Sequence, residues 1–409
     1  MKSSRSLNVK YSLIQALSCL GMCAMLGYAS VFLLYRGFSN ASIGVVISIS
    51  SIISTILQPT LAAFVNKTKK IALKDFISIV MGISTIFAIA ACFIKSQLLL
   101  GIVIIIMSAL VMGSMPLITS LTFEYEKHGY KINFGLARGI GSASYAIMSL
   151  VLGYLTKMYN PSIIPLFYVI STIGLLMLIY SFRISKDELS SLDNKINEKV
   201  EEDEVGLTMI QFVKKYKKFM FLVLGIVLVF VDHSIINTFT IQIVEGLGGD
   251  SSSMGNAIFI AAILELPVMM YFMKLKEKVN CSKLIMISAI VFSIKHIIIF
   301  LATNMTMIYF AQILQAASYA LYLPASVYYV SQLINKRDAI KGQGIIGGAT
   351  TLASVIASSS GGFLLDIIGT KNLLLFGAVV SVIGTIIVCL SVEDLDNKKS
   401  QLEKNINID

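Results

Sequence analysis

Long apolar runs separated by short polar turns extend along the whole chain. Each run is long enough, at about 1.5 Å rise per residue, to cross a hydrocarbon core of roughly 30 Å. A soluble protein of this length would instead alternate amphipathic and polar segments. The pattern predicts twelve membrane-spanning helices, over residues 11–35, 41–65, 76–94, 97–122, 132–157, 161–183, 219–244, 251–273, 284–302, 305–333, 339–368 and 371–391.

The longest polar stretch divides these spans into two sets of six. It predicts an N-terminal six-helix half (1–184), a cytoplasmic central loop (185–218), a C-terminal six-helix half (219–392) and a cytoplasmic tail (393–409). A weak internal repeat favours two related halves. Arg138-Gly139-Ile140-Gly141 opens the fifth span, and Lys341-Gly342-Gln343-Gly344 opens the eleventh. The predicted fold is therefore all-α and integral to the membrane.

Composition and charge agree with this fold and add an orientation. Apolar residues make up 56% of the chain and charged residues only 14%, which excludes a soluble globular protein. Of the 33 Lys and Arg residues, 27 lie in or beside one alternating set of polar segments and 4 in the other. Because positive residues are retained in the cytoplasm, both termini are predicted to be cytoplasmic, in a multi-pass protein of the cell membrane. The net charge of +10 then reflects topology and contact with membrane lipid, not nucleic acid.

Three ionisable residues fall on consecutive spans of the C-terminal half. Counted from the nearest lysine at the cytoplasmic end, Asp232, Glu265 and Lys295 lie about 21, 14 and 18 Å deep. An ionisable side chain at such depth costs several kcal/mol, which makes it a candidate functional residue. Pro267 frees backbone groups near Glu265 and is expected to allow a bend there.

Two carboxylates and one cation at a common depth predict a charge-paired site with a spare carboxylate. Such a carboxylate could load and release a proton when a substrate changes its pairing. Asp232, Glu265 and Lys295, with His296 beside the lysine, are the candidate residues for proton coupling. The alternative is a fixed ion pair that only holds helices together.

Other polar residues in the spans could bind a substrate. Arg138 has Glu124 and Glu126 as candidate partners and could bind hydroxyl groups or a carboxylate, or it could extend to cytoplasmic water. The remaining candidates are side chains that could line a cavity, although each could equally be a packing residue: Tyr145, Asn237, Gln315 and Tyr319.

Catalytic, nucleotide-binding and metal-binding motifs are missing from the sequence. It contains no G-x-x-x-x-G-K-[ST], no G-x-S-x-G and no H-E-x-x-H pattern. The five cysteines do not have the spacing of metal ligands. We therefore expect neither an enzyme nor a cofactor or metal site.

Twelve spans in two halves resemble the major facilitator superfamily, and within it the lactose permease-like group and the related nucleoside and phenylpropionate permeases. The stretch from Asn133 to Arg138, with Gly141, resembles the start of helix five in lactose permease, where an arginine binds sugar. On this match Tyr145 takes the place of a tryptophan that stacks on the sugar. Asp232, Glu265 and Lys295 match charged positions of helices seven, eight and nine. The helix-eight glutamate contacts sugar in that group, so the resemblance also implies that Glu265 binds the substrate. Helix ten differs, because it has no carboxylate and carries Gln315 and Tyr319.

These features favour a monomeric secondary transporter that moves a small polar solute, of the sugar or nucleoside type, by alternating access with proton symport. The alternative is an exporter of drugs or other amphipathic compounds by proton antiport. The 19 methionines and 22 phenylalanines would suit its cavity, although the fifth span lacks the proline of the usual exporter signature. A membrane sensor or enzyme is a third class, which would need a soluble domain or a catalytic motif.

Overall fold

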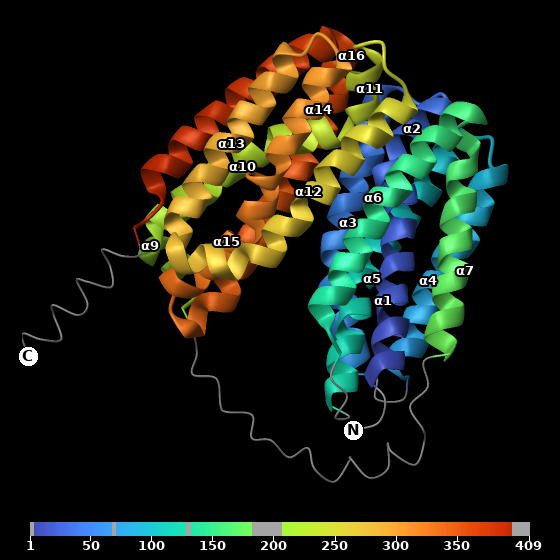
Figure 1. Ribbon diagram of the computed structural model, residues 1–409, viewed down its shortest axis with the longest axis horizontal. Coiled ribbons are helices and arrows are strands. Elements are labelled where there is room, and N and C mark those ends of the chain that lie inside the picture. The colour runs from blue at the N-terminus through green and yellow to red at the C-terminus, as the bar shows by residue number, and fades with distance from the viewer. Residues whose placement is uncertain (1–3, 68–70, 128–131, 182–206, 395–409) are drawn as a thin grey trace, which may run out of the picture. The chain divides into compact units, whose positions relative to one another are not determined.

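The computed structural model describes residues 4–67, 71–127, 132–181 and 207–394, and most of these are helical (Figure 1). The described residues contain no β-strand. Ten helices in this part of the chain are long and apolar enough to cross a membrane. The predicted all-α membrane fold is confirmed. Most of the predicted central loop, up to residue 206, and the predicted tail from residue 395 lie outside the described residues.

The first compact unit contains residues Met1–Lys199 and Gly249–Ile263. Within it, α1 packs on α6 and α7, α3 packs on α5, and α4 packs on α5 and α7. Its helices are α1 (Ser4–Met22), η1 (Cys23–Gly27), α2 (Ala29–Tyr35), α3 (Asn40–Lys67), α4 (Leu73–Phe93), α5 (Gln97–Lys127), α6 (Phe134–Met158), η2 (Pro161–Ile163), α7 (Ile164–Ser181) and the first half of α12 (Ser251–Lys278).

The second compact unit contains residues Val200–Gly248 and Leu264–Asp409. Here α16 packs along α10 and α13, and α13 also packs on α15. Its helices are the second half of α12, together with α9 (Met209–Lys215), α10 (Lys217–Thr238), α11 (Thr240–Glu245), α13 (Cys281–Leu301), α14 (Met305–Ile313), η3 (Leu314–Ala316), α15 (Tyr319–Leu333), η4 (Lys336–Asp338) and α16 (Ala339–Ser391).

Two irregular positions reconcile the ten long helices with the twelve predicted spans. Gly369 has φ +75° inside α16, a conformation that glycine adopts readily, and it divides this 53-residue helix into two spans. The gap between the predicted spans 339–368 and 371–391 falls on the same residue. The predicted span 305–333 is interrupted between α14 and α15, so neither helix alone is long enough to cross a membrane.

Close contact between α10 and α16 depends on two glycines. A Cβ atom on Gly225 would lie 2.8 Å from the carbonyl oxygen of Gly384, and one on Gly384 would lie 2.7 Å from the carbonyl oxygen of Gly225. Small residues of this kind allow helix backbones to touch inside a membrane. The contact also brings Asp232 of α10 against Gly377 in the second half of α16.

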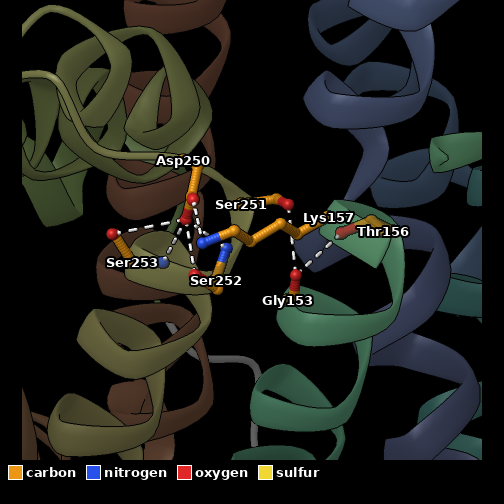
Figure 2. Close-up of polar contacts among 7 residues, drawn as sticks. All are labelled: Gly153, Thr156, Lys157, Asp250, Ser251, Ser252 and Ser253. Atoms are coloured by element: carbon orange, nitrogen blue, oxygen red, sulfur yellow. Dashed lines mark hydrogen bonds and ion pairs between the residues drawn. The ribbon is translucent and has the colours of Figure 1, made fainter. Parts of the chain in front are cut away.

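A polar contact joins the start of α12 to α6 within the first unit (Figure 2). Lys157 Nζ lies 2.8 Å from Asp250 Oδ2, and the hydroxyl of Ser251 donates to the carbonyl of Gly153 over 3.1 Å. The two backbones are close here, because a Cβ atom on Gly255 would lie 2.5 Å from the carbonyl oxygen of Ser149. The first half of α12 is thus held on α6 by backbone fit as well as by charge.

Asp250 also caps α12. Its Oδ1 accepts hydrogen bonds from the backbone N–H groups of Ser252 and Ser253 over 2.9 and 3.0 Å. Burial alone would raise the pKa of Asp250, but the hydrogen bonds from Lys157, Ser252 and Ser253 outweigh it and hold the pKa well below its usual value. Asp250 therefore stays ionised at neutral pH.

Candidate functional site

Glu265, Gln315 and Lys295 form a hydrogen-bonded row inside the second unit. Gln315 Nε2 donates to Glu265 Oε1 over 2.9 Å, and Lys295 Nζ donates to Gln315 Oε1 over 2.5 Å. Lys295 is 1% exposed and Gln315 6%, whereas Glu265 is only half-buried. A carboxylate, an amide and an ammonium group on α12, η3 and α13 thus lie in one connected set.

A helix break places Gln315 in this row. The hydrogen-bonding pattern changes to a 3₁₀ turn at Leu314–Ala316, and α15 starts only at Tyr319. The hydroxyl of Ser288 on α13 donates to the carbonyl of Ser318 over 2.8 Å. This carbonyl also accepts the backbone N–H of Tyr322 over 2.9 Å, so the serine ties the break to α13. Discontinuous helices of this kind commonly mark binding sites in secondary transporters. Neither glycine nor proline lies at the break, so sequence signals for it are absent.

Asp232 and His296 form a second polar group one residue further along α13. His296 Nδ1 lies 3.2 Å from Asp232 Oδ2 and 2.8 Å from the hydroxyl of Ser381, and His296 and Asp232 are each 1% exposed. Among the described residues, no hydrogen-bond donor meets either carboxylate oxygen in good geometry. This is a carboxyl group held in the interior with a single ring nitrogen beside it.

Two residues that sequence reasoning missed shape the space around this pair. A Cβ atom on Gly377 would overlap Oδ1 of Asp232, so the carboxyl group fits only because position 377 has no side chain. Ser381, one helical turn later, contacts His296, and its hydroxyl oxygen also lies 3.1 Å from Ser293 Oγ. Both residues lie far from Asp232 in the sequence, and only the packing of α10 on α16 brings them together.

An aromatic wall lies beside the two polar groups. The rings of His233 and Tyr319 are stacked with centroids 5.5 Å apart, and His233 Nε2 is 3.1 Å from the side-chain nitrogen of Asn237. Asn237 is exposed and Tyr319 half-buried. The predicted candidates Asn237 and Tyr319 therefore lie together, with His233 between them.

The other predicted substrate residues, Arg138 and Tyr145, belong to α6 in the first unit. Arg138 is exposed, and its Nη1 is 3.7 Å from Cys19 Sγ. The side chains of its candidate partners, Glu124 and Glu126, lie outside the described residues. Tyr145 is half-buried, and its hydroxyl lies where a Cβ atom on Gly27 would approach within 2.7 Å.

The two helices that carry the carboxylates differ sharply in burial. In the most apolar 18-residue stretch of α10, the helix that carries Asp232, 72% of the residues are buried. In the corresponding stretch of α12, which carries Glu265, 6% are buried. Glu265 therefore lies on the span most open to its surroundings, and Asp232 on a span enclosed by protein. Within the described residues, no group of three His, Cys, Asp or Glu side chains is arranged to hold a metal ion.

Comparison with known proteins gives a family model and two relatives that match most of the chain. A family model described as "MFS_1 like family" matches residues 13–376. The uncharacterized transporter YwbF of Bacillus subtilis (strain 168) is 22% identical over 352 residues, which cover 85% of this chain and 83% of that protein. The maltose permease of Geobacillus stearothermophilus is 21% identical over 357 residues, 86% of each chain.

Solved structures show a similar fold at low identity. The crystal structure of the nucleoside transporter NupG superposes with a TM-score of 0.79, covering 96% of this chain and 100% of that chain at 14% identity. A bacterial homologue of the human lysosomal transporter Spinster, in an inward-facing and occupied conformation, gives a TM-score of 0.64 at 13% identity.

Proposed function

Because the chain belongs to the MFS_1 like family of membrane transporters, we propose that it carries a small polar solute, of the sugar or nucleoside type, together with protons. Family membership confirms the resemblance to the major facilitator superfamily found in the sequence. It also makes the protein a multi-pass membrane transporter of small molecules and not an enzyme. The solute class and the proton coupling are our proposals.

The row of Glu265, Gln315 and Lys295 is the observation that carries the proposal. Carboxylate and amide oxygens accept hydrogen bonds from hydroxyl groups, and the amide and ammonium groups donate them. A polyhydroxylated solute could therefore exchange its hydroxyls for contacts within this row. Glu265 is the only half-buried member, since Gln315 and Lys295 are buried, so we propose that the solute meets Glu265 first.

Asp232 and His296 are the proposed proton-binding pair. A buried carboxyl group in a membrane span is costly when ionised, so a proton on the pair relieves that cost. Lys295 and His296 are neighbours on α13, and they face the solute row and the proton pair respectively. A change in the hydrogen bonds of Lys295 can therefore alter the field at the proton pair, which provides a physical route for coupling.

Four further residues are proposed to complete the solute site. Asn237 and Tyr319 flank His233 in the second unit, where an amide and a ring can contact the hydroxyls and the face of a sugar or base. Arg138 and Tyr145 are proposed contacts from the first unit, on the resemblance of their sequence to helix five of lactose permease.

The division of the chain and its orientation also stay predictions. We propose that residues 1–184 and 219–392 form two six-helix halves of a monomer in the cytoplasmic membrane, with both termini in the cytoplasm. The asymmetry of Lys and Arg supports this orientation. Labelling of single introduced cysteines by a membrane-impermeant reagent tests it, because those in segments 185–206 and 395–409 should react only after the cells are opened.

Transport is tested in proteoliposomes that contain the purified chain and an internal pH dye. Maltose and uridine are the first probes, followed by a panel of sugars, nucleosides and amphipathic cations. We expect addition of the transported solute outside to acidify the interior, and Glu265→Gln to reduce solute binding at least about tenfold, since it removes a charged acceptor. If only amphipathic cations respond, with protons moving in the opposite direction, the exporter alternative replaces this proposal.

A further inference from the structure

A short helix lies immediately before the span α10. Helix α9 begins with a capping box, in which Thr208 and Gln211 exchange side-chain and backbone hydrogen bonds, and it ends at Lys215. Tyr216 then leaves the helical conformation, with φ −107° and ψ 48°, and α10 starts at Lys217 (Figure 1). Helix α9 is therefore a separate element at the very edge of a membrane-spanning segment.

Three aromatic side chains fix α9 to the second unit. Phe212 and Phe219 are fully buried and Tyr216 is 7% exposed. The Phe212 ring lies 4.8 Å from that of Tyr216 and 6.1 Å from that of Phe219, between centroids. Because one face of α9 and the turn after it are held in this way, the opposite face has a defined orientation.

A second anchor holds Leu207, two residues before α9. The backbone N–H of Leu207 donates to Oδ1 of Asp338 over 3.0 Å, and Lys341 Nζ lies 3.2 Å from the same oxygen. Asp338 is only 3% exposed, so its carboxylate interacts with Leu207 and Lys341 inside the unit and not with solvent. The carboxylate of Asp338 is therefore already paired with Lys341, and it does not neutralise the lysines of α9.

The exposed side of α9, together with the start of α10, combines apolar and basic groups. Ile210 is 71% exposed, Met209 57% and Val213 39%, and their spacing places them on one side of the helix. Four exposed lysines follow within five residues. We call this set the α9 patch; it consists of Met209, Ile210, Val213, Lys214, Lys215, Lys217 and Lys218.

We propose that the α9 patch lies in the membrane interface and binds the headgroups of anionic phospholipids. The candidate span begins at Lys217, so this proposal places α9 where hydrocarbon meets headgroups. Exposed apolar side chains on a short helix at that level can insert between lipid chains, while the neighbouring ammonium groups pair with phosphate. A soluble acidic partner would match the lysines but would leave the three apolar side chains without an apolar environment.

The chain contains no tryptophan, so a single introduced one reports on its own surroundings. Ile210→Trp, in the full-length protein in nanodiscs, is quenched by brominated lipid in contact with it. We expect brominated phosphatidylglycerol to quench more strongly than brominated phosphatidylcholine at equal mole fraction, with an apparent enrichment of about two- to fivefold that falls at high salt.

Matched variants isolate the lysines. Changing Lys214, Lys215, Lys217 and Lys218 to Gln should abolish the preference for the anionic lipid and leave the thermal midpoint unchanged, because all four are exposed. Changing Lys274, Lys276 and Lys278 to Gln should leave the preference intact. Phe310→Trp, at a 58% exposed position in α14, should show no preference.

Equal quenching by the two lipids in the Ile210→Trp protein overturns the proposal, as does a preference that survives the four substitutions at α9. The acidic segment Glu198–Glu204 is the competing occupant. If the preference appears only after Glu201 and Glu202 are changed to Gln, the patch binds the chain's own acidic segment and the lipid proposal is wrong.

Discussion

Two pairs of ionisable side chains, each an acid beside a base, lie in very different surroundings in this transporter. Lys157 and Asp250 have side chains that are 55% and 40% exposed, and Asp250 accepts further hydrogen bonds from the start of α12. His296 and Asp232 are 0% and 1% exposed, and the carboxyl group has no well-placed donor among the described residues. An exposed pair contributes little to stability because water solvates each partner, whereas a buried charge is costly.

This difference in burial indicates that the exposed pair is a structural contact and that the buried pair is a candidate for a role in transport. In the first unit the close approach of glycines on α6 and α12 would hold the helices together even without the ion pair. In the second unit the ionisable groups are costly to bury, and removing one partner leaves another buried polar group unpaired. Groups kept in a membrane span at this cost favour a role in transport. Substitutions in both units can test this distinction.

Lys295→Met should have the largest effect on stability. The substitution keeps the volume but removes the donor to Gln315, and it leaves buried polar groups without a partner. We expect a loss of about 3 kcal/mol in the free energy of unfolding, measured by thermal or chemical unfolding in detergent. Lys157→Met is the control in the exposed pair and should leave the midpoint almost unchanged. Similar losses in the two variants would contradict the comparison.

Gly377→Ala should come next. A methyl group there overlaps the carboxyl group of Asp232, which is enclosed and cannot move away freely. The expected cost is about 1–3 kcal/mol, together with reduced transport. Gly347→Ala, in the same helix with open space around it, should be neutral or slightly stabilising. A neutral Gly377→Ala would show that the carboxyl group is not confined as described.

Gly255→Ala tests the backbone fit in the first unit. Its methyl group would lie 2.5 Å from the carbonyl oxygen of Ser149, so α12 must move away from α6. We expect a loss of about 1–2 kcal/mol, measured as above. Gly139→Ala is the control in α6, because a Cβ atom added at Gly139 would have no neighbouring atom within 4 Å outside its own helix. A loss smaller than that of Asp250→Asn would assign the contact to charge instead.

Asp250→Asn should have the smallest effect, because asparagine also caps a helix and the pair is exposed. The pKa of Asp250 is below its usual value, so its contribution is complete above about pH 4 and is lost only as the pH falls through the lower pKa of the folded protein. From about pH 5 to about pH 8 the midpoints of variant and wild type should differ by a constant amount of no more than about 2 °C. A difference that changes across this range would contradict the assignment.

The membrane spans could be predicted because hydrophobic length is a local signal. The predicted spans 132–157 and 97–122 correspond to α6 and α5, and the predicted gap at residues 369–370 coincides with the kink at Gly369. The break between α14 and α15 could not be predicted, since it lacks glycine and proline. Pro267 lies within α12, which is one continuous helix, and the bend expected at this residue stays a prediction.

The candidate site was predictable only in part. Buried charges stand out in an apolar sequence, which identifies Asp232, Glu265 and Lys295 as candidates. Their partners depend on packing between distant segments: Gln315 reaches Glu265 across 50 residues of sequence, and His296 reaches Ser381 across 85. The contacts of Gly377 and Ser381 with the proton pair have no local sequence signal at all.

The proposed division of roles is tested most directly by comparing Asp232→Asn with Glu265→Gln in two assays on the same proteoliposomes. One assay measures exchange of the transported solute at equal concentration and pH on both sides; the other measures proton movement and uphill accumulation. Our account predicts that Asp232→Asn keeps exchange but reduces proton movement and accumulation to background, while Glu265→Gln loses solute binding and hence both activities. Proton-coupled accumulation that survives in Asp232→Asn would contradict it.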